Sequence, residues 1–137
     1  MSLLLLFSGA VLPTVGRPAS DVTTGAWVPS TGVSLFDVIN EVVPDDGDYI
    51  STTTAAPCTM TLESTLFPGS ASQQKINYRA SSTQGSNLTV RMFQGATTIM
   101  TRTHALTGIN TLYTQSLTSP EIALITAGAI SIELTAT

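Results

Sequence analysis

The sequence predicts an all-β fold: an antiparallel β-sandwich of jelly-roll type with one or two short helices and an extended N-terminal arm. The chain has 137 residues, which suits one domain around a single core. Charged residues make up only 10%, and the polar positions are filled by Ser and by Thr, which favours strands. About seven or eight short predicted strands are separated by turn-forming residues roughly every 8–12 residues. This spacing is typical of an antiparallel β-sandwich.

The N-terminal segment, residues 1–25, is predicted to be an arm, and residues 26–137 are predicted to form the sandwich domain. No basic residue precedes the apolar run at the start of the chain, so it lacks the form of a secretory signal, and it is too short to span a bilayer. We interpret it as a buried strand or as an arm docked on a neighbouring subunit. The run consists of Leu3, Leu4, Leu5, Leu6 and Phe7.

Residues 8–32 are rich in Gly, Pro, Ser and Thr and have no hydrophobic period. We expect extended connecting chain there, with at most a short strand at residues 26–28. Trp27, the only tryptophan of the chain, is expected to be half buried against the sandwich.

One or two helical turns are predicted within residues 34–42. Ser34 is the expected N-cap, and Pro44 is expected to stop the helix. The apolar residues at helical spacing are Leu35, Val38, Ile39 and Val42.

Strands are predicted wherever apolar and polar residues alternate. A hairpin turn is expected at Gly95. The register of the next strand is ambiguous, because the neighbouring residues Ile99 and Met100 would point to opposite faces. The residues expected to face the core are Cys58, Met60, Leu62, Ile76, Tyr78, Leu88, Val90, Met92, Ile130, Ile132 and Leu134.

A short helix is predicted after the strand at residues 111–117. Thr118 or Ser119 is its expected cap, Pro120 suits the first turn, and Glu121 adds a favourable acidic residue there.

The most acidic stretch, residues 42–51, places Asp45, Asp46 and Asp48 around Gly47. It could be a calcium loop, half of a catalytic carboxylate pair, or a turn before a strand. The EF-hand spacing fails in both frames that we tried, and no other acid makes a recognisable pair with these residues. A turn is therefore favoured, because Asp and Gly tolerate turn dihedral angles, while a calcium site outside the EF-hand pattern stays open.

Other residues that could carry chemistry are few. His104 is interpreted as a strand histidine bonded to a neighbouring hydroxyl or carbonyl, and Cys58 as a small core residue. One Cys and one His exclude a zinc cluster. The net charge of −4 and five scattered basic residues argue against a nucleic-acid partner. We therefore predict no enzymatic activity, no catalytic or metal-binding residues and no cofactor.

Several pieces of the sequence, taken in order, resemble a small structural domain of tailed bacteriophages and prophages. The resemblance covers about four fifths of the chain, from residue 26 to the end, and departs from the family pattern at residues 100–102, where the family tends to have Trp. Residues 1–25 have no counterpart. The pieces are "SLFDVINEVVPDDGDYIST", "PCTMTL", "INYRA", "LTVRMFQGATTI", "THALTG", "LYTQSLTSPEIALIT" and "ISIELTA".

The resemblance implies a non-enzymatic virion protein made in the bacterial cytoplasm, and our leading hypothesis is a capsid decoration (cement) protein. Its expected partners are the major capsid protein or other virion proteins and further copies of itself, with no nucleic acid and no membrane. The low charge fits a surface covered by neighbours. The residues expected to make contacts are the Leu3–Phe7 run and Trp27.

Two alternatives to a decoration protein stay open. One is a carbohydrate-binding module on a head or tail fibre, which is less favoured because aromatic residues are only 6% of the chain. The other is a tail or head–tail connector subunit that assembles as a ring.

Overall fold

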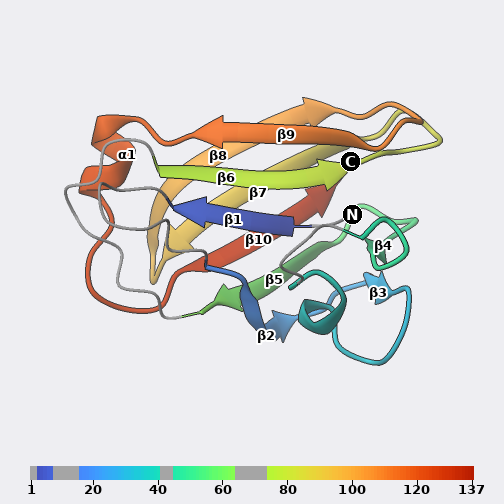
Figure 1. Cartoon of the computed structure of the whole chain (residues 1–137), viewed down its shortest axis with the longest axis horizontal. Coiled ribbons are helices and arrows are strands. Elements are labelled where there is room, and N and C mark those ends of the chain that lie inside the picture. The colour runs from blue at the N-terminus through green and yellow to red at the C-terminus, as the bar shows by residue number, and fades with distance from the viewer. Residues whose placement is uncertain (1–2, 8–15, 41–44, 64–73) are drawn as a thin grey trace.

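The computed structural model describes residues 3–7, 16–40, 45–63 and 74–137 (Figure 1). Strands in antiparallel sheets dominate these residues, with one short α-helix and one 3-10 turn, so the predicted all-β class is confirmed. The sandwich and jelly-roll detail stays a prediction. Neither helical segment is long and apolar enough to cross a membrane.

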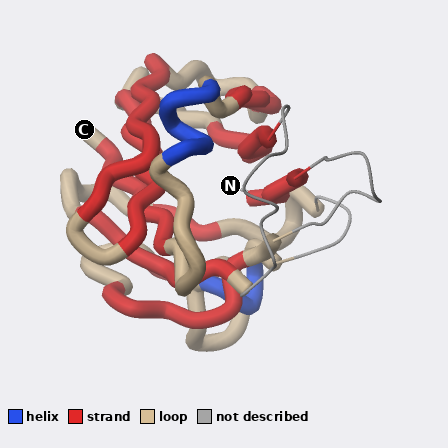
Figure 2. Tube along the Cα trace, turned by 90° about the vertical axis from the view of Figure 1, so that its left-hand side faces the viewer, coloured by secondary structure: helices blue, strands red, loops and turns tan. Residues whose placement is uncertain are grey.

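The described strands form three sheets, and every paired strand is antiparallel to its neighbours. The three-stranded sheet has the order β1 (Leu3–Phe7), β6 (Gln74–Ala80), β9 (Thr111–Ser116). The five-stranded sheet has the order β2 (Pro18–Thr23), β5 (Pro57–Leu62), β10 (Ser131–Ala136), β7 (Asn87–Gln94), β8 (Thr97–Ala105). A small pair joins β3 (Val28–Pro29) to β4 (Ile50–Ser51). Figure 2 shows the same strands after a turn of 90° about the vertical axis.

The inner faces of the two larger sheets share one hydrophobic core. All the side chains that alternation predicted to face inward are buried there. In the middle of the five-stranded sheet, Ile132 of β10 lies opposite both Met60 of β5 and Met92 of β7, and all three are fully buried. The prediction that apolar and polar residues alternate between the two faces of these strands is therefore confirmed.

A β-bulge resolves the ambiguous register of β8. Met100 pairs with Met92, while Thr98 pairs with Phe93, so Ile99 has no partner of its own in the ladder. The extra residue lets both Ile99 and Met100 turn inward, and both are buried. The hairpin before it is as predicted, with Gly95 in the left-handed region at φ 56°.

The helical segment after residue 34 is one turn, the shorter of the two predicted lengths, and it is capped differently from the prediction. It is a single 3-10 turn, Phe36–Val38, without a side-chain cap at its start. The backbone N–H groups at its start have no acceptor within the turn itself. Those of Leu35 and Phe36 donate instead to the carboxylate of Asp21, at 2.8 and 3.0 Å. The prediction of Ser34 as N-cap is wrong, because a carboxylate from the neighbouring β2 strand supplies the acceptors. Val42 and Pro44 lie outside the described residues.

The predicted short helix is present as α1, Ser119–Ala123. Of the two predicted caps, Thr118 is the N-cap. The Thr118 hydroxyl accepts from the backbone N–H of Glu121, and the Glu121 carboxylate accepts from the backbone N–H of Thr118. This reciprocal capping box fixes the path of the chain from β9 toward β10.

The segment predicted to be an arm contains two strands that join the sheets. The backbone of Leu3–Phe7 forms β1, paired with β6 of the same chain; its side chains lie outside the described part. Strand β2, which sequence analysis treated as connecting chain, pairs with β5. The short strand expected at residues 26–28 is instead Val28–Pro29.

Candidate functional site

Trp27 is more buried than predicted. Only 7% of it is exposed, and its indole Nε1–H donates to the carbonyl oxygen of Ala56 at 2.7 Å. Its own backbone N–H closes a turn by donating to the carbonyl oxygen of Thr24. The expectation of a half-buried ring is therefore wrong: the indole is fixed within the fold and lines a groove.

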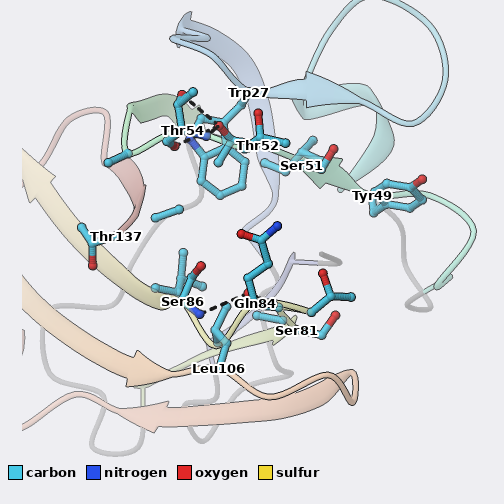
Figure 3. A pocket seen from close by; sticks show the side chains of 18 of the residues that line it. Trp27, Tyr49, Ser51, Thr52, Thr54, Ser81, Gln84, Ser86, Leu106 and Thr137 are labelled. Carbon is cyan, nitrogen blue, oxygen red and sulfur yellow. Dashed lines mark hydrogen bonds between the residues drawn. The ribbon is translucent and has the colours of Figure 1, made fainter.

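The groove lies at one end of the two larger sheets and has a volume of about 520 Å³ (Figure 3). Its wall comes from the end of β4 with the connection that follows it (residues 51–55), the β6–β7 connection at residues 81–86, the β8–β9 connection and the end of β10. We call it the hydroxyl groove, because most of its lining residues are Ser, Thr, Asn or Gln. They are Ser51, Thr52, Thr53, Thr54, Ser81, Ser82, Thr83, Gln84, Ser86, Asn110 and Thr137.

Strand direction explains why distant segments meet at this end. In the three-stranded sheet, Ala80 at the end of β6 lies opposite Thr111 at the start of β9. In the five-stranded sheet, Asn87 at the start of β7 lies opposite Ala105 at the end of β8. Antiparallel pairing thus brings the loops that follow β6 and β8 to the same edge of the fold.

Local hydrogen bonds hold these loops in shape. The Ser82 hydroxyl accepts from the backbone N–H groups of Gln84 and Ser86, both at 3.2 Å. The Ser82 backbone N–H donates to the carbonyl oxygen of Thr107, which ties the β6–β7 loop to the β8–β9 loop. On the facing wall, the Thr52 hydroxyl accepts from the backbone N–H of Thr54 and donates to its carbonyl oxygen. The groove is therefore preformed by its own loops.

Several polar side chains of the groove are free to bind a ligand. Within the described ranges, the side chains of Ser51, Ser81, Gln84 and Asn110 form no hydrogen bond. Figure 3 shows the Gln84 side chain extending from its loop toward Trp27 on the facing wall. The side chains of Thr52 and Ser82, by contrast, are used to shape the loops.

The acidic stretch forms a turn at the rim of the groove. The Asp45 carboxylate accepts from the backbone N–H of Gly47 at 2.8 Å, and Asp46 pairs with Arg79 at 2.8 Å. No group of three or more His, Cys, Asp or Glu that could hold a metal ion occurs in the described part of the chain. The turn interpretation is confirmed for residues 45–48.

His104 lies between the two larger sheets at their open edge. Its Nε2 is hydrogen-bonded to the hydroxyl of Tyr78, which comes from β6 in the other sheet. Its ring also contacts Tyr113 of β9, with centroids 4.3 Å apart. Next to it, Arg102 pairs with Glu121 of α1 at 2.8 Å. The expected hydroxyl partner is confirmed, and the contact joins β6, β8 and β9.

Burial keeps the titratable groups of the interior neutral near pH 7. It lowers the pKa of His104, and the nearby Arg102 lowers it further. Burial also raises the pKa of Tyr78, with a further contribution from Tyr113. The pKa of the Cys58 thiol rises to about 12, mainly through burial, so the nucleophilic thiolate is suppressed and Cys58 is the core residue predicted.

We expect acid to weaken the fold through His104. The pKa of His104 in the folded chain lies below the ordinary histidine value of 6.5, so the unfolded chain binds the proton more readily. The stability contributed by the neutral imidazole is present above about pH 6.5 and falls as the pH drops toward the folded pKa. Urea unfolding at pH 7.5 and 5.5 should show a smaller loss of stability in His104→Gln than in the unchanged chain. An equal loss in the two proteins would contradict this assignment.

The hydroxyl groove could not be predicted from the sequence, because its residues come from loops far apart in the chain. One sequence signal could have indicated the groove. Three loops are rich in Ser, Thr, Asn or Gln, and antiparallel pairing places these loops at the same end of the fold. Comparisons with protein-family models, with curated proteins and with solved structures found no match to this chain.

Proposed function

We propose that this chain is a non-enzymatic structural protein of a tailed phage virion, a decoration protein that binds the capsid lattice and neighbouring subunits. The ordered sequence motifs described above support the proposal. So does the composition of the chain, which is rich in Ser and Thr and has only 10% charged residues.

One surface feature carries the proposal furthest. Three valines between residues 22 and 33 are exposed: Val22 by 60%, Val28 by 57% and Val33 by 93%. Val22 belongs to β2, the outer strand of the five-stranded sheet, and the other two lie in the chain that follows. Single exposed apolar residues are common, but three exposed valines within one short stretch of chain, one on the outer strand β2 and two in the segment after it, are a candidate partner-binding surface. We call this set the valine edge.

Strand β1 gives the proposal its second contact. It occupies the edge of the three-stranded sheet through backbone pairing with β6. A strand that adds to this edge within one chain can add to the same edge of a neighbouring copy. In the proposed lattice, β1 of one subunit pairs with β6 of the next in this register.

The proposal is tested by adding purified protein to phage heads that were assembled without this chain. Sedimentation should show saturable binding, and the bound heads should release DNA at a higher temperature. The double variant Val22→Lys/Val33→Lys should bind at least about tenfold more weakly, because charge is placed in a desolvated contact. A truncation that lacks residues 2–12 tests the β1 contact in the same assay.

The matched control is Leu112→Lys/Leu124→Lys, which changes apolar residues exposed by 60% and 43% that lie outside the valine edge. It should bind heads like the unchanged protein. The proposal fails if the unchanged chain does not bind heads, or if the two double variants bind equally well. If the truncated chain binds heads as well as the full chain does, β1 does not contribute to attachment.

A further inference from the structure

We infer that the hydroxyl groove is a binding site for a neutral saccharide. The inference stands on the geometry of the groove and does not depend on attachment to a virion. Four features carry it: charge, free hydrogen-bonding groups, aromatic surface and shape.

The groove has almost no charged lining residues, so it is poorly suited to an ionic ligand. Asp46 is the one charged residue among those that line it, and Arg79 pairs with it at 2.8 Å. No lysine or arginine lines the groove to hold a phosphate or carboxylate, and no cluster of carboxylates in the described ranges could hold a cation. A ligand that is polar but uncharged fits this lining best.

The free hydrogen-bonding groups match those of a sugar. Ser51 lies on the β4 wall, Ser81 and Gln84 on the β6–β7 loop, and Asn110 on the β8–β9 loop. Hydroxyl and amide side chains both donate and accept, as sugar hydroxyls do. Because the four groups come from three segments, a ring with hydroxyls on its rim can bond to several of them at once.

The groove has one exposed aromatic side chain at its rim and one mostly buried aromatic ring, 7% exposed, in its wall. Tyr49 lies at the rim, is 43% exposed and has its backbone N–H fixed by the Ser30 hydroxyl at 3.0 Å. The Trp27 indole forms part of the wall that faces Gln84 (Figure 3). The C–H groups on one face of a sugar ring are apolar and pack against such rings, while the hydroxyls at the edge bond to the polar wall.

The shape of the groove favours a short oligosaccharide over a peptide. A volume of about 520 Å³ lies within the usual range for small-ligand sites, about 300–1,000 Å³. Loops and strand ends form its walls, whereas a peptide that binds by strand addition needs a free strand edge along its length.

The test is a glycan array of neutral and acidic oligosaccharides, followed by calorimetric titration of the full chain with the strongest neutral array glycan. Saturable binding to neutral glycans is expected. The double variant Gln84→Ala/Asn110→Ala should weaken it by about tenfold, because two hydrogen bonds to the ligand are lost. Tyr49→Ala should also weaken it. None of these side chains is buried, so the variants should fold.

Gln115→Ala is the matched control, since this glutamine lies on β9 outside the groove. It should bind the same glycan as tightly as the unchanged chain. Absence of glycan binding overturns the inference, as does binding restricted to acidic glycans. Binding that Gln84→Ala/Asn110→Ala and Gln115→Ala affect equally also overturns it, and so does a peptide that occupies the groove while neutral glycans do not.

Discussion

Replacing Trp27 by Ala should lower the free energy of unfolding by about 3–5 kcal/mol, the usual cost of truncating a buried aromatic side chain to Ala. The indole is 7% exposed and belongs to the hydrophobic core. The substitution also removes the donor to the Ala56 carbonyl oxygen, which ties the start of β3 to the chain just before β5. Urea unfolding followed by far-UV circular dichroism measures the loss.

Trp27→Phe separates the two contributions of the indole. It keeps much of the buried ring and removes only the N–H donor, so the expected loss is smaller, about 1–3 kcal/mol. If Trp27→Ala cost less than Trp27→Phe, or if neither variant changed stability, the buried position of the ring would be wrong.

Gly25→Ala should be nearly as damaging, at about 2–5 kcal/mol. Gly25 has φ 57°, a left-handed conformation that a Cβ atom disfavours. A Cβ at this position would also lie 2.2 Å from the carbonyl oxygen of Pro57, the first residue of β5. Backbone would therefore have to move, and thermal unfolding should show a clearly lower midpoint.

Gly32→Ala is the control for the clash. Gly32 has a similar φ of 69°, but a Cβ there would meet nothing within 4 Å. The expected loss is only the conformational part, about 1–2 kcal/mol. Equal losses at Gly25 and Gly32 would mean that the close approach to Pro57 has no energetic effect.

The parts of the fold that could be predicted from the sequence are those where a short run of residues determines the structure by itself. Alternation placed Cys58, Met60 and Leu62 on the inner face of β5, and all three are buried. The capping signal at Thr118 to Glu121 needs only neighbouring residues, and it is realised as a full capping box. Such features depend on a few residues in a row, so a sequence pattern suffices to find them.

The parts that were missed depend on contacts between distant residues. Strand β2 has two register shifts against β5, which break the alternation that would have identified it. The 3-10 turn is capped by Asp21, which precedes Leu35 by 14 residues, so a search for a local cap selected Ser34 instead. The candidate site was missed for the same reason, because Ser51, Gln84 and Asn110 meet only after the sheets have formed.

The unpaired Ile99 in β8 also bears on which surfaces can take part in assembly. Strand β8 is the outer strand of the five-stranded sheet at the side opposite β2. A bulge in an outer strand increases its twist and interrupts the regular ladder that a foreign strand would need in order to pair. Uncontrolled growth by edge-to-edge pairing is therefore hindered on the β8 side. Strand β2, the outer strand on the other side, has two register shifts of its own, so regular ladder pairing is hindered at both edges of this sheet, and a partner at the proposed valine edge would have to bind through side chains.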